Sequence, residues 1–173
     1  MRLAVFLTTL LFSCTTIAAP IPSTGTVEVF FSPRGGATDA VVSEIAKAKN
    51  EILVQAYSFT SKPIAKALID AKKRGVKIEA VLDKSNATAK YSAATFLFNA
   101  GIPVLIDDKH AIAHNKIIII DKFTLITGSF NFTSAAENKN AENLLVIKQN
   151  KSLADRYLNN FSNHKSHSEP YSR

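Results

Sequence analysis

Two periodicities of apolar residues alternate along the chain. Short runs that are apolar on both faces predict buried strands, and apolar residues three or four apart predict amphipathic helices. The strands are expected at 27–32, 52–57, 76–82, 103–106, 116–120, 123–127 and 142–147. Helices are expected from Thr38, from Ser61, around Ala93 to Ala100, and over 152–161. The tail from 163 to 173 is polar, and we expect it to be frayed.

The ends of two helices have recognisable signals. Thr38 or Asp39 is the expected N-cap of the first helix, because a short polar side chain can accept a hydrogen bond from a free backbone amide. Ser61, with Pro63 just inside, opens the second helix. Lys72-Lys73-Arg74-Gly75 closes it with cations and a glycine, as the helix dipole favours.

The order of these elements predicts the fold class. Strands that alternate with helices indicate an α/β fold with a mixed, largely parallel sheet sandwiched between helices. A tight turn at Asp121-Lys122 joins two successive strands, and this hairpin makes the sheet mixed. The length of 173 residues suits one domain, and the sequence shows no internal repeat.

The N-terminus predicts a signal peptide at residues 1–22, followed by a single domain over 23–173. Met1-Arg2 gives a positive start, the stretch from Leu3 to Ala19 is apolar or small, and Ala18-Ala19 offers a cleavage site. We therefore expect a periplasmic or secreted protein. A weak lipoprotein box ending at Cys14 is the alternative. Cleavage within 18–23 would remove Cys14 and leave a mature chain without cysteine, which excludes disulfides and cysteine catalysis.

The charge of the chain indicates which classes of partner it can bind. The formal net charge is +7 and the isoelectric point is about 9.5. A basic protein favours polyanionic partners such as nucleic acid or anionic lipid, although the charge could also serve solubility alone.

The stretch His114-Asn115-Lys116 and the four isoleucines after it carry the strongest chemical signal. Side chains two apart on a strand project from the same face, so His114 and Lys116 should lie together. A neutral imidazole can attack phosphorus, and an ammonium beside it can hold the phosphate oxygens. Asp121 comes five residues after Lys116, an odd spacing, so on a strand its side chain would project from the opposite face. We therefore expect a structural role for Asp121, capping the backbone of the hairpin or pairing with a cation.

A second polar run, Gly128-Ser129-Phe130-Asn131, follows the next predicted strand. The spacing His-x-Lys-x4-Asp with a later Gly-Ser-x-Asn resembles the signature of the phospholipase D superfamily. Residues 113–146 resemble its single-motif branch, called HKD. The whole chain, with Gln55-Ala56-Tyr57-Ser58-Phe59-Thr60, is similar to the small bacterial non-specific endonucleases of that family.

This resemblance implies roles for individual residues. His114 would form a covalent phosphohistidine, and Lys116, Ser129 and Asn131 would contact the phosphate. Glu142 stands where the family has a carboxylate that orients the nucleophilic imidazole. Such a carboxylate would fix the tautomer of the His114 imidazole and stabilise the imidazole cation that forms during the reaction.

The remaining histidines and carboxylates suggest no metal site. His110 and His114 have helical ligand spacing but lead into a strand, and Asp107-Asp108 with Glu137 makes a poor magnesium site. His164 and His167 are tail residues without a partner pattern. We expect neither a metal nor a cofactor.

The sequence thus predicts a metal-independent phosphodiesterase that acts as a non-specific endonuclease on DNA, with RNA left open. One alternative is a phospholipase D or phosphatidyl transferase, and another is a non-catalytic nucleic-acid-binding module. We expect no stable membrane association. Attack and leaving-group protonation need two histidines, and the motif occurs once, so we expect a homodimer with one shared active site.

Overall fold

The computed structural model describes residues 19–172. The predicted signal peptide, with the alternative at Cys14, lies almost entirely outside the described residues. It stays a prediction, as do the domain bounds and the periplasmic or secreted location. Within residues 19–172, no helix is both long enough and apolar enough to cross a membrane.

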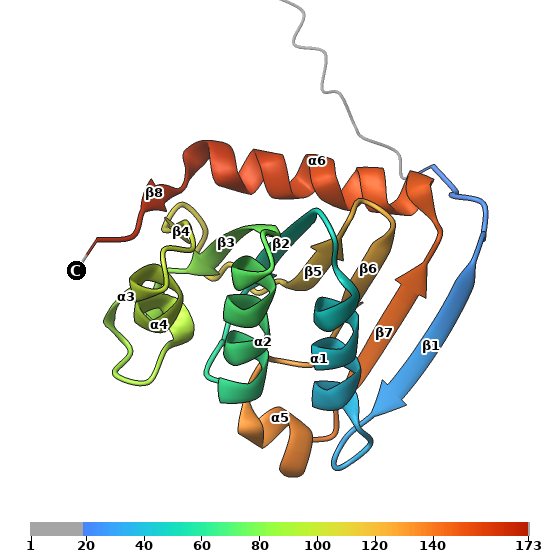
Figure 1. Cartoon of the computed structure of the whole chain (residues 1–173), viewed down its shortest axis with the longest axis horizontal. Coiled ribbons are helices and arrows are strands. Elements are labelled where there is room, and N and C mark those ends of the chain that lie inside the picture. Colours follow the sequence, from blue (N-terminus) through green and yellow to red (C-terminus); the bar gives the residue numbers. More distant parts are fainter. Residues whose placement is uncertain (1–18, 173) are drawn as a thin grey trace, which may run out of the picture.

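In the described part of the chain, eight strands form one sheet in the order β1-β7-β6-β5-β2-β3-β4-β8 (Figure 1). The strands are β1 (Thr26–Phe31), β2 (Glu51–Ala56), β3 (Lys77–Asp83), β4 (Val104–Asp107), β5 (Lys116–Ile120), β6 (Thr124–Gly128), β7 (Asn143–Lys148) and β8 (Glu169–Pro170). The helices are α1 (Ala37–Lys47), α2 (Lys62–Lys73), α3 (Ser85–Thr88), α4 (Ala93–Asn99), α5 (Ser134–Asn138) and α6 (Lys151–His167).

The α/β class and the mixed sheet between helices are confirmed, but the expectation of a largely parallel sheet is wrong. Among the strands of residues 19–172, the parallel pairings are those of β3 with β2 and of β3 with β4. The other pairings are antiparallel. The reason is that strands alternate with crossover helices only up to β4. After it, β5 and β6 form a hairpin through Asp121 and Lys122, which both have positive φ.

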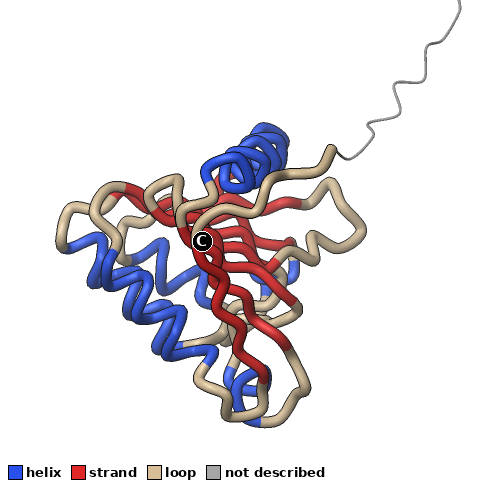
Figure 2. Tube along the Cα trace, turned by 90° about the vertical axis from the view of Figure 1, so that its right-hand side faces the viewer, coloured by secondary structure: helices blue, strands red, loops and turns tan. Residues whose placement is uncertain are grey.

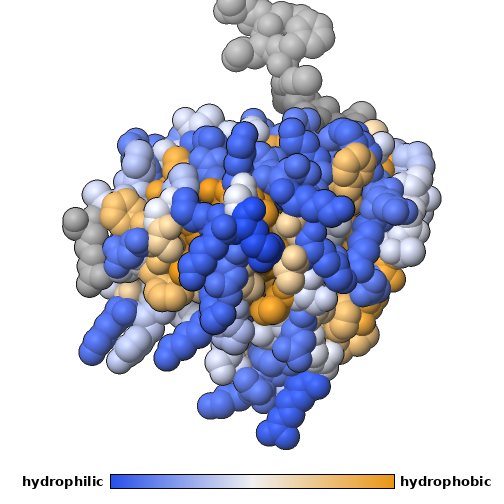
Figure 3. Space-filling model, in the orientation of Figure 1, coloured by the Kyte–Doolittle hydropathy of each residue, from blue (hydrophilic) through white to orange (hydrophobic). Residues whose placement is uncertain are grey.

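Helices cover both faces of the sheet (Figure 2). The larger core lies between the sheet and the layer of α1, α2 and α4, and the smaller one lies under α6. On β5 the side chains alternate between the two cores: Ile118 enters the larger and Ile119 the smaller. This explains why the strand is apolar at every position after Lys116. On the face seen in Figure 1, hydrophilic side chains dominate and apolar ones show in smaller patches (Figure 3).

The start of α1 is capped from a distant part of the chain. The helix begins at Ala37, after Gly36, so neither Thr38 nor Asp39 is its N-cap. The carboxylate of Glu137, on α5, instead accepts hydrogen bonds from the amides of Gly36 (3.2 Å) and Thr38 (2.7 Å). A carboxylate at a helix N-terminus satisfies free amides and complements the helix dipole.

The C-terminal tail is ordered against the sheet, which corrects the expectation that it is frayed. Helix α6 extends to His167, and β8 pairs with β4. Tyr171 is buried, and its hydroxyl shares a hydrogen bond of 2.7 Å with Thr95. A buried aromatic ring and a paired strand hold a segment whose polar composition suggested a loose end.

Candidate active site

His114 lies exposed in the loop that enters β5. Asp83, at the end of β3, accepts a hydrogen bond of 2.8 Å from the amide of Ala113. The amide of Tyr57 donates to the carbonyl of Asn115 at 2.8 Å, and the Tyr57 ring centroid lies 4.6 Å from that of His114. The backbone on both sides of His114 is therefore fixed while its imidazole faces solvent.

Lys116 is the first residue of β5, and it is 6% exposed. Its ammonium nitrogen lies 3.0 Å from Nδ1 of His114 and 2.8 Å from the carbonyl oxygen of the same residue. It also lies 5.3 Å from the centroid of the Tyr57 ring, a cation–π contact. Burial lowers the pKa of Lys116, and the negative charge of Glu142 opposes that shift. The predicted pairing of His114 and Lys116 is present.

The contact between these residues has one direction. An ammonium only donates hydrogen bonds, so Nδ1 of His114 is the acceptor. A nucleophilic imidazole must present a ring nitrogen with a free lone pair, and in this structure Lys116 engages that of Nδ1.

Gly128, at the end of β6, permits a close approach to β7. It has φ of 146°, and a Cβ at this position would lie 2.3 Å from the carbonyl oxygen of Asn143. Ser129 then pairs with Asn143 through two hydrogen bonds. Its Oγ accepts from the backbone amide of Asn143 at 3.0 Å, and its backbone amide donates to the Asn143 carbonyl oxygen at 3.1 Å. Only glycine allows this geometry, and it sets where Ser129 lies.

Asn131 follows in the same loop. Its Oδ1 is buried and has no hydrogen-bond partner among residues 19–172. Buried side-chain amides are normally paired, so this oxygen is an unsatisfied hydrogen-bond acceptor. The predicted phosphate contacts of Ser129 and Asn131 stay predictions.

Glu142 comes just before β7 and is half-buried. Its carboxylate accepts a hydrogen bond of 3.2 Å from the side-chain amide of Asn140. Within the described residues it makes no hydrogen bond to His114, although its charge acts on Lys116. Its role in orienting the imidazole therefore stays a prediction.

Asp121 lies beyond the opposite end of β5 from Lys116. Its carboxylate accepts hydrogen bonds from the backbone amides of Lys49 (2.9 Å), Asn50 (2.7 Å) and Glu51 (2.9 Å). Burial raises the pKa of Asp121, but these amides outweigh burial and lower it overall. Asp121 thus caps backbone amides of the turn before β2 and not those of the predicted hairpin.

A cleft of about 350 Å³ brings several of these residues together. His114, Lys116 and Gly128 line one side of it, and Arg156 and Asn160 of α6 line the other. The sequence reasoning missed both α6 residues, because only tertiary packing places that helix over β5. A larger hollow of about 1070 Å³ between α2 and α4 is mainly apolar and contains none of the predicted site residues.

Residues 41–165 match the family described as cardiolipin synthase, PLD-like domain. The chain belongs to the phospholipase D superfamily. It is 47% identical over 139 residues to the phospholipase D of Rickettsia conorii, which covers 80% of this chain and 69% of that relative. The human mitochondrial cardiolipin hydrolase is 35% identical over 92 residues, 53% of this chain and 36% of that one.

Among solved structures, the phospholipase D family member Nuc of Salmonella typhimurium superposes with a TM-score of 0.82. It is 43% identical, and the match covers 86% of this chain and 99% of that one. Phospholipase D members are phosphodiesterases, so this chain is an enzyme of the hydrolase class.

Proposed function

We propose that this phospholipase D member is a metal-independent phosphodiesterase that cuts DNA as a non-specific endonuclease, with RNA as a further candidate substrate. The observation that carries the proposal is the contact between His114 and Lys116 in an open cleft. The ammonium nitrogen of Lys116 lies 3.0 Å from Nδ1 of His114. A neutral imidazole and a partly buried ammonium are the two groups that attack at phosphorus requires.

The reaction would proceed in two displacements. A ring nitrogen of His114 forms a bond to phosphorus while the bond from phosphorus to the leaving oxygen breaks. A second histidine gives that oxygen a proton. Water then attacks the phosphohistidine, releases the imidazole and leaves a phosphate monoester. Lys116 holds the non-bridging oxygens throughout, with Ser129 and Asn131 as further phosphate contacts.

The charge at the cleft supports a nucleic-acid substrate. The chain carries a net charge of +7, and Arg156 adds a guanidinium opposite His114 and Lys116. Such cations attract a phosphate backbone without reading its sequence. The structural match to Nuc over nearly all of that chain supports the same proposal.

Lipid phosphodiesters are the second candidate. They are favoured by the relatives named phospholipase D and mitochondrial cardiolipin hydrolase. A non-catalytic binding module is disfavoured, since binding alone needs no histidine held against a buried lysine. The proposed cellular location is the periplasm or the exterior, which depends on the signal peptide.

A homodimer would supply the second histidine. The chain has four histidines, and His110, His164 and His167 all approach Asp107. His114 is therefore the one histidine that lines the cleft, and the general acid would be His114 of a second copy. One shared site would then lie on the two-fold axis.

An apolar strip on β1 supports that assembly. Val29 pairs with Leu145 of β7, which in turn pairs with Thr127, a residue that lines the cleft. Paired residues share a face of a sheet, so Val29 and Phe31 flank the cleft. They are 48% and 68% exposed, a large fraction for apolar side chains beside an active site.

The test compares substrates directly. The protein should nick and degrade plasmid DNA, and His114→Asn should abolish cutting while its circular dichroism stays unchanged. Vesicles of phosphatidylcholine or cardiolipin, assayed for headgroup release, give the lipid comparison. Release of lipid headgroups from the vesicles, without cutting of DNA or RNA, would overturn the nuclease proposal in favour of the lipid candidate.

The metal requirement is tested in the same assay. Lys116 offers the positive charge that a metal would otherwise supply, so plasmid cutting should persist in excess EDTA. Complete loss in EDTA that magnesium alone restores would contradict the histidine mechanism.

A further inference from the structure

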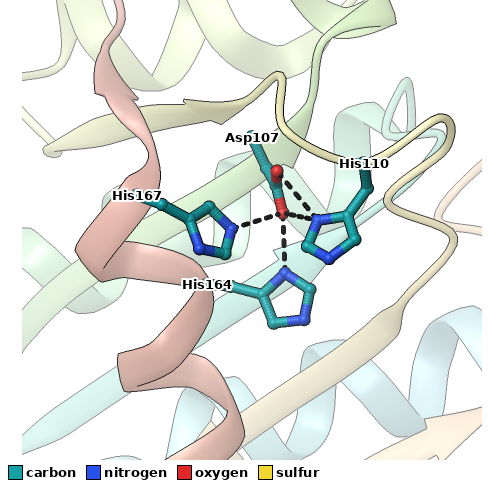
Figure 4. A group of neighbouring side chains, drawn as sticks. All are labelled: Asp107, His110, His164 and His167. Carbon is teal, nitrogen blue, oxygen red and sulfur yellow. Dashed lines mark hydrogen bonds and ion pairs between the residues drawn. The ribbon is translucent and has the colours of Figure 1, made fainter. Parts of the chain in front are cut away.

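Three histidines surround one buried carboxylate at the end of β4 (Figure 4). Asp107 is the last residue of β4 and is completely buried. Its Oδ2 lies 2.9 Å from Nδ1 of His110, 2.6 Å from Nδ1 of His164 and 3.4 Å from Nε2 of His167. The ring centroids of the histidines are 4.7 to 5.5 Å apart.

Hydrogen bonding leaves this group incompletely satisfied. One carboxylate oxygen faces three ring nitrogens, and Nε2 of His167 is buried without a hydrogen-bond partner within the described residues. Burial disfavours the charge of Asp107, but hydrogen bonds from His164 and His110 hold its pKa below the usual range. The group is thus a buried anion surrounded by convergent imidazoles.

The composition and size of the group suit a metal ion. Three imidazoles and one carboxylate are ligands that zinc accepts in a tetrahedral arrangement. One ligand atom from each residue lies within 4.8 Å of the others. Tetrahedral bonds of about 2.0–2.1 Å would place ligand atoms about 3.4 Å apart, so small side-chain shifts would complete the site.

We propose that Asp107, His110, His164 and His167 form a binding site for a divalent transition metal, with zinc as the expected ion. Four protein ligands would close the coordination sphere, which is typical of structural zinc sites. The metal would therefore stabilise the fold and take no part in the chemistry at His114. The earlier expectation of no metal, based on tail residues without a partner, missed the contact between α6 and β4.

The position of the site suggests what the metal would do. His110 lies four residues before His114 in the same loop. His164 lies four residues after Asn160 on α6, which is about 6 Å along the helix. A metal held by both segments would tie together the loop that carries His114 and the helix that forms the opposite wall of the cleft.

The two flanking segments are already fastened at other points. Lys84 donates a hydrogen bond of 3.1 Å to the carbonyl of His110, and Lys165 pairs with Glu79 at 2.8 Å. These contacts keep the backbones in place without the ion. Zinc would add a link between two preformed segments, so we expect the metal-free protein to fold.

The experiment measures metal binding on protein without a polyhistidine tag, because a tag would bind zinc itself. The protein is dialysed with zinc, then against metal-free buffer, and zinc per chain is measured by mass spectrometry. We expect one ion per chain. His110→Gln and His167→Gln, both partly exposed positions, should weaken binding at least about tenfold. His114→Gln is the matched control and should retain the ion.

Two further readouts do not depend on any variant. Cobalt added to the wild-type protein should give the visible absorption of a tetrahedral nitrogen and oxygen site, and zinc should raise its melting temperature. The proposal is overturned if no ion is retained, or if His110→Gln and His167→Gln bind as well as the wild type. Loss of the ion in His114→Gln would place it in the cleft instead. All of these measurements omit substrate, so they stand apart from the proposed nuclease activity.

Discussion

The ammonium nitrogen of Lys116 lies 3.0 Å from Nδ1 of His114, where a solvent-exposed loop enters a buried strand. The two residues have opposite environments, since Lys116 is 6% exposed and His114 faces solvent. Burial makes the lysine charge costly, and the nearby Glu142 offsets part of that cost. A charge held in this way is pre-oriented for the anion that forms during phosphoryl transfer.

The lowered pKa of Lys116 predicts the alkaline limb of the activity profile. An ordinary lysine loses its proton near pH 10.4, and Lys116 should do so at a lower pH. Activity should therefore fall as pH rises, before an ordinary lysine titrates. Lys116→Ala should lose about 10²–10³-fold or more in kcat at neutral pH. Lys116→Arg, whose charge does not titrate, should lack this limb, and an unchanged limb in that variant would exclude Lys116 as its source.

Asp121 should affect stability and leave catalysis unchanged. Asp121→Ala removes an acceptor from three backbone amides and should cost about 1–3 kcal/mol in the free energy of unfolding. The folded pKa of Asp121 is lowered, so its stabilisation is present above the unfolded pKa of about 3.9 and is lost as pH falls through the folded value. Melting curves at neutral and acid pH should show the difference narrowing in acid. A folded but inactive Asp121→Asn would contradict the structural role.

The sequence predicted those features that depend on neighbours along the chain. The contact of His114 with Lys116 joins residues two apart in the chain, although His114 lies in the loop before β5, and the hairpin follows from the residues at Asp121. Alternating burial in β5 explains the unbroken isoleucine run. Each of these is local, so a few residues suffice to predict it.

Features that depend on distant contacts could not be predicted in this way. Glu137 caps α1 across about a hundred residues, and no local pattern at Thr38 indicates it. The Asp107 group joins β4 to α6. Its one sequence signal is a pair of ligand spacings, Asp107-x-x-His110 and His164-x-x-His167, that only the fold brings together.

Gly128 should tolerate no side chain. In Gly128→Ala the new Cβ would overlap the carbonyl of Asn143, and φ of 146° is unfavourable for any L-residue. We expect a loss of about 3 kcal/mol or more in the free energy of unfolding. Gly75→Ala is the control, because Gly75 also has positive φ but open space around its Cβ position, and it should cost about 1–2 kcal/mol. Equal losses in urea unfolding would show that the close approach to β7 is unimportant.

Binding of DNA should weaken steeply as salt rises. Contacts between Lys or Arg and phosphates release counterions, so the logarithm of the affinity falls linearly with the logarithm of the salt concentration. The measurement uses the inactive His114→Asn variant and a labelled duplex between about 50 and 200 mM salt. Arg156→Gln, at the wall of the cleft, should weaken binding. It should also reduce the slope of log affinity against log salt concentration by about one. Affinity that ignores salt would rule out a groove that follows the phosphate backbone.

The proposed dimer can be broken at the apolar strip of β1. Phe31→Glu places a charge on a side chain that is 68% exposed, so the monomer should still fold. If the strip is the interface, this variant should be monomeric by light scattering and inactive, because His114 has lost its partner. Phe96→Glu is the matched control: Phe96 is 52% exposed and lies on α4, on the opposite side of the sheet. It should remain dimeric and active.

The stoichiometry of the covalent intermediate tests the shared site itself. Two copies of His114 at one centre can attack one phosphorus at a time, so quenching at high pH should trap one phosphate per dimer. Proton transfer to the leaving group is worth about 10²–10⁴-fold, and a dimer of one wild-type and one His114→Asn chain should lose at least that factor. Full activity in a monomer, or one phosphate on every chain, would show instead that each chain carries a complete site.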